Sequence, residues 1–258
     1  MISLLERTRK INKLLQKSEK VDYDEMSTLL STVMGANVYI ISNDGKLLGY
    51  ACLDNFECDL MLDKVLLPGI FPEYYVEWLL KINETSPNLT LKGGLCAFSE
   101  GKPCLFNDKF TTIVPIYGVG ERIGTLIVAK FHVEFNTADL ISAEYGATVV
   151  GMEFLRERSD KIEEEARQRA TVQVALGSLS YSELEAVTHI LNELKGNEGL
   201  LVASQIADRV GITRSVIISA VRKLESAGVI ESKSLGMKGT FIKVLNERLF
   251  AELKKLNN

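Results

Sequence analysis

The side chains best suited to chemistry fall on one short helix that we predict near the end of the sequence. Residues 203–245 read as a helix (203–210), a tight turn, a second helix (214–227) and two short strand-like runs. One stripe of the second helix offers guanidinium and hydroxyl groups for base edges and an apolar side chain for a thymine methyl: Arg214, Ser215, Ile218, Ser219 and Arg222. Helix, turn, helix and β-wing together predict a winged helix-turn-helix that binds double-stranded DNA.

The residues around this stripe support the same interpretation. Gly211 permits the positive φ needed to end the first helix abruptly, and Thr213 is a suitable N-cap for the second. Over 203–245, seven basic and three acidic side chains give a net charge of +4, whereas the whole chain has −4. A basic patch on an acidic chain is typical of a DNA-contacting module, although a helix-turn-helix used only for protein contacts is the alternative. The predicted contacts are completed by two wing lysines and three further residues: Lys233, Lys238, Ala203, Ser204 and Thr213.

A second group of side chains is apolar and aromatic and lies near predicted loops. It occupies 58–75 and 96–99 and includes Met61, Val65, Phe71, Tyr75 and Phe98. Apolar groups on loops often line a small-ligand pocket. They could equally form ordinary core beneath a connecting segment, and composition does not separate the two possibilities.

The sequence argues against several other function classes. The glycine run at 118–124 is followed by a strand and not a helix, so it predicts a hairpin turn and not a phosphate loop. No nucleophile, base and orienting group can be assembled from spacing, so we predict no enzyme. Four cysteines without CxxC spacing and two distant histidines predict reduced thiols and no metal site: Cys52, Cys58, Cys96, Cys104, His132 and His189. Without a signal peptide or an apolar run of membrane-spanning length, we expect a cytoplasmic protein with no membrane contact.

The fold class expected from the whole pattern is α+β. An antiparallel sheet flanked by helices (1–155) would be joined by a helical linker (156–177) to the DNA-binding domain (178–258). The pattern predicts helices over 2–17, 23–34, 72–81, 137–176 and 180–194, a short helix or ordered loop over 57–67, a polar loop over 82–94, and strands over 37–42, 46–52, 95–98, 104–106, 111–117, 123–131, 229–233 and 240–245. Small residues at 146, 147 and 151 allow close packing, either on the domain's own sheet or across a dimer interface.

Several longer segments resemble the CodY family of nutrient-responsive repressors from low-GC Gram-positive bacteria. The similarity runs through GKLLGY (45–50), FPEYY (71–75), TTIVPIYGVGERIGTLIV (111–128), AEYGATVVGMEFLRE (143–157) and most of 179–246. It implies a GAF domain that binds branched-chain amino acids (isoleucine, valine or leucine), a long linker helix and a winged helix. It also implies a homodimer, GTP as a second effector, and repression of genes that are needed when nutrients run short.

Carried over by position, the family's isoleucine pocket falls on Met61, Phe71, Pro72, Tyr75, Cys96, Ala97, Phe98 and Ser99, with Val65 beside them. One departure concerns the ligand carboxylate, because Leu60 stands where the resemblance leads us to expect an arginine. Lys64 is the nearest cation and could substitute, and backbone N–H groups of 96–99 are another possible donor set. The main alternative function is a nucleotide-only sensor of GTP, in which the GAF domain is a structural core.

Overall fold

The structure, a computed structural model, describes residues 3–16, 22–53, 56, 58–90, 94–98, 102–106, 108–194 and 196–256. The chain divides into two compact units, Met1–Arg158 and Ser159–Asn258. Helix α5 (Thr137–Gly177) begins in the first unit and ends in the second. The predicted linker, 156–177, is the second half of this helix.

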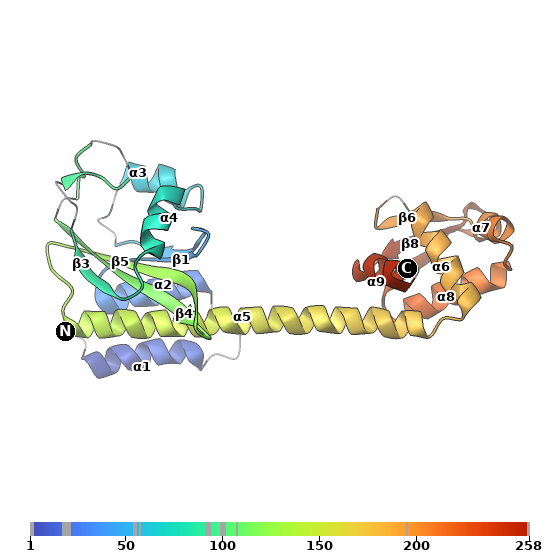
Figure 1. Ribbon diagram of the computed structural model, residues 1–258, viewed down its shortest axis with the longest axis horizontal. Coiled ribbons are helices and arrows are strands. Elements are labelled where there is room, and N and C mark those ends of the chain that lie inside the picture. Colours follow the sequence, from blue (N-terminus) through green and yellow to red (C-terminus); the bar gives the residue numbers. More distant parts are fainter. Residues whose placement is uncertain are drawn as a thin grey trace. The chain divides into compact units, whose positions relative to one another are not determined.

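The first unit is built on a five-stranded antiparallel sheet with strand order β2-β1-β5-β4-β3 (Figure 1). Its strands are β1 (Asn37–Ser42), β2 (Leu47–Ala51), β3 (Ser86–Leu89), β4 (Lys109–Gly118) and β5 (Glu121–Phe131). Successive side chains of a strand point to opposite faces. In β1, Val38 and Ile40 therefore enter one core, and Tyr39 and Ile41 enter another. The sheet is thus buried on both faces.

Helices cover the two faces differently (Figure 1). The helices α1 (Leu4–Leu15), α2 (Tyr23–Met34) and the first part of α5 contribute to the core on one face. On the other face lie α3 (Asp59–Met61), a π-helical turn (Leu62–Leu66) and α4 (Glu73–Leu80). The hydrophobic core on this second face is the smaller of the two. The loops around it carry the apolar residues singled out in the sequence.

Two sequence-based expectations about strands are wrong in this unit. Residues 95–98 and 104–106 form no strand and are joined by a single bridge between Leu95 and Pro103. Conversely, β3 lies inside the segment expected to be a polar loop. Its sequence, SPNL, has little strand character, but pairing with β4 satisfies its backbone, and the Asn88 N–H donates to Thr112 Oγ1 at 3.2 Å. Tertiary pairing therefore overrides local propensity here.

The glycines of α5 pack within the first unit. A Cβ at Gly146 would lie 2.6 Å from Leu30 Cδ2, and one at Gly151 would lie 2.8 Å from the Tyr117 carbonyl oxygen. Of the two alternatives left open by the sequence, packing on the domain's own elements accounts for both positions. The run at 118–124 forms the hairpin between β4 and β5, as expected, with the turn at Val119 and Gly120.

A buried ion cluster ties α1 to the start of α5. Asp139 accepts hydrogen bonds from Arg7 Nη1 at 2.6 Å and from Lys130 Nζ at 2.5 Å. Burial by itself would raise the pKa of Asp139, but the bonds from Lys130 and Arg7 outweigh it and hold that pKa below its usual value. The carboxylate is therefore charged, and it joins α1 to β5 and α5, which lie more than a hundred residues later in the chain.

The second unit contains α6 (Tyr181–Glu193), α7 (Ala203–Val210), α8 (Arg214–Ser226) and α9 (Arg248–Leu256). A three-stranded sheet of order β6-β8-β7 comprises β6 (Glu198–Leu201), β7 (Ile230–Ser234) and β8 (Thr240–Val244). The capping box predicted for Ser180 and Glu183 is present at the start of α6. The sequence does not predict strand β6, because it is formed by pairing with β8. Helix α9 is a second element that is not predicted from the sequence.

Candidate ligand cavity and nucleic-acid interface

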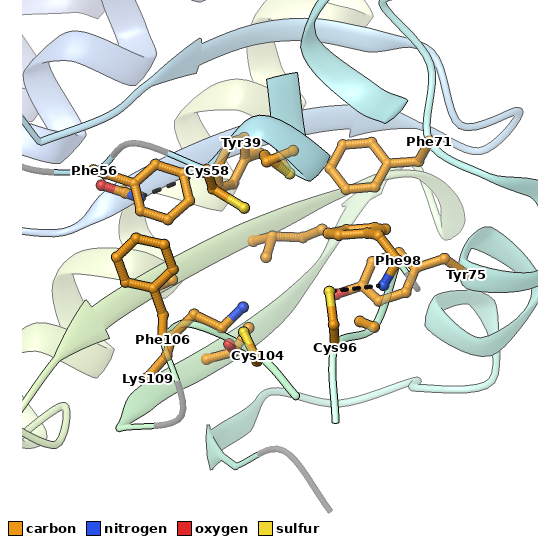
Figure 2. Close-up of a pocket in the computed structure, with 16 residues that line it drawn as sticks. Tyr39, Phe56, Cys58, Phe71, Tyr75, Cys96, Phe98, Cys104, Phe106 and Lys109 are labelled. Atoms are coloured by element: carbon orange, nitrogen blue, oxygen red, sulfur yellow. Dashed lines mark hydrogen bonds between the residues drawn. The ribbon is translucent and has the colours of Figure 1, made fainter. Parts of the chain in front are cut away.

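The first unit contains a cavity on the sheet face opposite α2 and α5 (Figure 2). The empty space in it, counted together with open solvent at its mouth, is about 580 Å³. Its floor is formed by alternate residues of the three central strands: Asn37, Tyr39, Lys109, Thr111, Ile127 and Ala129. Register explains the grouping, since Tyr39 pairs with Ile127, and Asn37 and Thr111 both pair with Ala129. Side chains on one face of neighbouring strands lie side by side, so the floor comes from three separate parts of the chain.

Aromatic rings form two sides of the cavity (Figure 2). The rings of Phe71 and Tyr75 are stacked with centroids 5.7 Å apart, and Phe98 lies 5.2 Å from Tyr75. On the other side, the centroids of Phe56 and Phe106 are 4.9 Å apart. Phe71 lies just before Pro72, the N-cap of α4, and Tyr75 lies in the first turn of that helix, so both rings face one cavity, as the sequence predicts. Such walls suit an aliphatic or aromatic ligand group.

The polar groups of the lining are few. Asn37 is fully buried, and its Oδ1 accepts a hydrogen bond from the Leu53 N–H at 2.8 Å. The Tyr39 hydroxyl lies 3.5 Å from Cys52 Sγ, and burial raises the pKa of Tyr39 well above its usual value. Thr111 adds a hydroxyl, and Lys109 is the one charged side chain among the described lining residues. The described part of the lining is therefore apolar with a single cation.

Most of the residues predicted for a ligand pocket do line this cavity. They are Met61, Phe71, Tyr75, Cys96, Ala97 and Phe98. Three others lie elsewhere: Lys64 is exposed, Val65 is fully buried in the core, and Pro72 is the N-cap residue of α4. Ser99 lies outside the described residues. Leu60 does not line the cavity.

Sequence reasoning missed the cavity floor. Thr111 and Ile127 lie on strands that the sequence predicts only as sheet, and Lys109 lies two residues before the strand predicted at 111–117. Asn37 and Tyr39 lie still farther away in the sequence. A usable signal was present, because alternation assigns 109, 111 and 113 to one face of β4. Choosing which face meets the loops required the tertiary structure.

The second unit presents α8 as an exposed helix. Its inner face, Ile217, Ala220, Val221 and Leu224, is buried as predicted. On the outer stripe Arg214, Ser215 and Arg222 are exposed, and Ile218 and Ser219 are half-buried. A shallow hollow is lined by Ser178, Ser215, Ile218, Ser219, Arg222, Lys223, Ser226 and Ala227. Gly211 has φ +75°, as the turn requires, but Thr213 makes no side-chain cap and instead hydrogen-bonds the Ser215 hydroxyl at 2.8 Å.

A buried carboxylate holds α8 against α6. Glu183 is 6% exposed and accepts hydrogen bonds from Lys223 Nζ at 2.7 Å and from Ser219 Oγ at 2.6 Å. Lys223, then Ser219, then the Ser180 N–H hold the pKa of Glu183 near 2. The Ser219 hydroxyl, assigned from sequence to the DNA-reading stripe, is thus occupied inside the domain. Lys223 also donates to the Ser178 carbonyl at 3.1 Å, just beyond the end of α5.

The wing consists of β7, β8 and the tip between them, and β7 follows α8 in the chain. Lys233 and Lys238 are exposed, as is Ser204 at the start of α7, whereas Ala203 is half-buried. The tip turns at Gly236 and Gly239, with φ +62° and +113°. Gly239 also lies close to another strand, because a Cβ there would be 2.4 Å from the Leu201 carbonyl oxygen. The glycines therefore set the shape of the tip that carries Lys238.

Comparison with known proteins supplies the family. Residues 3–178 match the model of the CodY GAF-like domain, and residues 197–257 match the model of the CodY helix-turn-helix domain. The chain belongs to the CodY family. Two CodY relatives, both called global transcriptional regulator CodY, are 58% identical in Clostridium kluyveri and 59% identical in Clostridium tetani. Each similarity extends over 258 residues and covers 99% of this chain and 100% of the relative.

A solved CodY domain is also similar in sequence. It is described as the cofactor binding GAF domain of the nutrient sensor CodY from Clostridium difficile. The identity is 38%, with 60% of this chain and 99% of that domain covered, and the TM-score is 0.43. By the two family models and the full-length relatives, this chain is a CodY-family transcription regulator with a GAF-like domain and a helix-turn-helix domain.

Two further observations limit the chemistry of this CodY chain. Among the residues that the structure describes, no group of three or more His, Cys, Asp or Glu side chains could hold a metal ion. Within the same residues, no helix has the length and apolar character needed to cross a membrane. The four cysteines are free thiols, and three of them, Cys58, Cys96 and Cys104, line the cavity.

Proposed function

We propose that this chain is a ligand-gated DNA-binding regulator, mainly a repressor, whose affinity for its operator rises when a branched-chain amino acid binds the GAF-like domain. In this proposal residues 1–155 sense the ligand, 156–177 form the linker, and 178–258 bind DNA. The observation that carries the ligand class is the aromatic cavity, whose described lining holds one cation.

The chemistry of the cavity favours an aliphatic amino acid over a nucleotide. A triphosphate needs several Lys or Arg side chains or a glycine-rich cradle. The described lining has one lysine and a wall formed by Phe71, Tyr75 and Phe98. Burying a Leu-sized or Ile-sized side chain against such rings is worth roughly 1.5–3 kcal/mol, or about ten- to a hundredfold in affinity. Isoleucine, valine and leucine fit this description, whereas a sensor of GTP alone is the competing function.

The DNA-binding surface that we propose consists of α8, the start of α7 and the wing. The bases would be read by the exposed guanidiniums of Arg214 and Arg222 together with Ser215 and Ile218. Phosphates would be met by the remaining members of the surface: Ala203, Ser204, Thr213, Lys233 and Lys238. Ser219 belongs to this surface by position, but its hydroxyl would serve the contact with Glu183.

Ligand binding can alter DNA affinity only through a difference between two states of the protein. The ligand must bind the DNA-competent state more tightly than the other, by the same factor by which it raises operator affinity. We further propose a homodimer, since a helix-turn-helix regulator of this kind binds two half-sites. GTP as a second effector follows from the family resemblance and would need a site outside the cavity.

Titration calorimetry of the full chain with isoleucine, valine, leucine and GTP tests the ligand class, and operator titration with each ligand tests the coupling. We expect the amino acids to bind and to raise operator affinity. Binding of GTP together with no heat from any amino acid would favour the nucleotide-only function. Light scattering at micromolar concentration tests the dimer, which a monomer mass would contradict.

A further inference from the structure

Lys109 is an unusual component of an otherwise apolar cavity. It is the first residue of β4, pairs with Phe131 in the register, and is half-buried. Figure 2 shows its ammonium nitrogen directed into the cavity, on the side occupied by Phe106 and Cys104. A positive charge among aromatic rings and thiols requires an explanation, because an ammonium group loses hydration when it is buried.

The charge of Lys109 has no partner within the described residues. No acidic side chain occurs among the described residues of the lining, and the Lys109 ammonium makes no ion pair or hydrogen bond with any described residue. Lys130, on the neighbouring strand β5, behaves differently, because its ammonium lies 2.5 Å from Asp139. Of these two half-buried lysines in one sheet, Lys130 thus has an acidic partner and Lys109 has none among the described residues. The unpaired one faces the cavity, which marks the place where an anionic group would bind.

Other groups are poorly placed to bind an anion there. Two backbone donors of 96–98 are already used, since the Cys96 N–H donates to the Lys102 carbonyl at 2.9 Å and the Phe98 N–H donates to Cys96 Sγ at 3.4 Å. Lys64 is exposed and outside the lining. The apolar Leu60 offers no charge. Among the residues described there, Lys109 therefore remains as the cation that a ligand inside the cavity would meet.

We propose that the Lys109 ammonium binds the carboxylate of the ligand, while the aliphatic side chain packs toward Phe71, Tyr75 and Phe98. This inference rests on the proposed function and names the anchor of that ligand. Lysine is a compact point charge, so it would hold the carboxylate by one contact and not by the two parallel bonds of an arginine. The carboxylate would accordingly lie beside β4, away from the helix that carries Leu60.

Matched lysine variants test the assignment. In calorimetry of the full chain with isoleucine, Lys109→Met weakens binding at least tenfold, because a hydrogen bond to a charged group is lost. Lys64→Met, a change of equal size outside the cavity, leaves the affinity within about twofold. Lys109→Arg keeps the charge and retains most of the binding. Thermal unfolding of each variant reports whether the fold is intact.

A ligand pair tests the same contact without relying on one variant. Isoleucine amide lacks the carboxylate, so the wild-type protein binds it at least tenfold more weakly than isoleucine, and Lys109→Met reduces that preference. The inference is overturned if Lys109→Met binds isoleucine as tightly as the wild-type protein does. It is also overturned if that variant keeps the full preference for isoleucine over its amide. Either result leaves the proposed function standing. If the Met variant fails to fold, an equal affinity of the wild-type protein for isoleucine and its amide overturns it. Absence of any binding of isoleucine, valine or leucine by the wild-type protein overturns the proposed function, and the inference with it.

Discussion

Replacing Glu183 by glutamine tests how the recognition helix is held. Glu183 lies in the first turn of α6 and joins that helix to α8 through Ser219 and Lys223. Glutamine keeps the size of the side chain but removes the charge, so Lys223 loses its ionic partner. We expect lower stability of the second unit and weaker operator binding, because the same contacts fix the position of α8.

The expected loss of stability follows from the pKa of Glu183. Glu183 has a pKa of about 2 in the folded chain, against an ordinary value of 4.5. Since a tenfold change in proton affinity is worth about 1.4 kcal/mol, the difference corresponds to roughly 3 kcal/mol of stability. The Lys223 side chain is 39% exposed, so solvent screens part of this interaction, and we expect a loss of about 2 kcal/mol.

The pH dependence has a definite sign. Because folding lowers the pKa of Glu183, its stabilising effect is fully present above pH 4.5 and is lost as the pH falls toward 2. The stability difference between wild type and Glu183→Gln should therefore be the same at pH 7 and pH 6 and smaller at pH 3.5.

Urea unfolding at these three pH values measures the difference, with Glu185→Gln as control because that residue lies on the same helix but is exposed. The control should match wild type at every pH. Equal stability of wild type and Glu183→Gln at pH 7 would refute the reasoning, as would a difference that does not shrink in acid.

Four further substitutions are expected to have separable effects. Arg214→Ala should lower operator affinity at least tenfold, about 1.4 kcal/mol, with unchanged thermal unfolding, whereas unchanged operator binding would show that this stripe does not contact DNA. Lys238→Ala should weaken binding to all DNA sequences alike and reduce the salt slope by about 1 in salt titrations. Phe98→Ala, which removes one ring of the cavity, should weaken isoleucine binding roughly tenfold by calorimetry and leave ligand-free operator binding intact. Asp139→Asn should destabilise the first unit by about 3–5 kcal/mol in urea unfolding, because two buried cations lose their common partner.

Several features of the fold could be predicted from the sequence because their causes are local. Ser180 and Glu183 form a capping box three residues apart, and Gly211 ends α7 in the left-handed conformation. The 41 residues of α5 contain no proline, so a continuous helix is possible. Alternation along β4 and β5 follows directly from strand geometry. The winged helix could therefore be identified, and its exposed arginine stripe placed, before any tertiary information.

Features that depend on distant partners were decided only by the tertiary structure. Strands β3 and β6 form because β4 and β8 supply hydrogen-bond partners, which outweighs their weak local propensity. The Ser219 hydroxyl turns inward because Glu183, 36 residues away, lies beneath it.

The clearest case is the ligand cavity. Sequence reasoning identified its wall at Phe71, Tyr75 and Phe98, where the residues are close in the chain or share an apolar segment. For the ligand carboxylate it offers Lys64, the nearest lysine in the sequence, or backbone N–H groups of 96–99, whereas Lys109 is the lysine in the described lining. Nearness along the chain says little about which residues of a sheet face a given loop. That is fixed by strand register and by the choice of face, which the sequence by itself leaves open because both faces of this sheet are apolar.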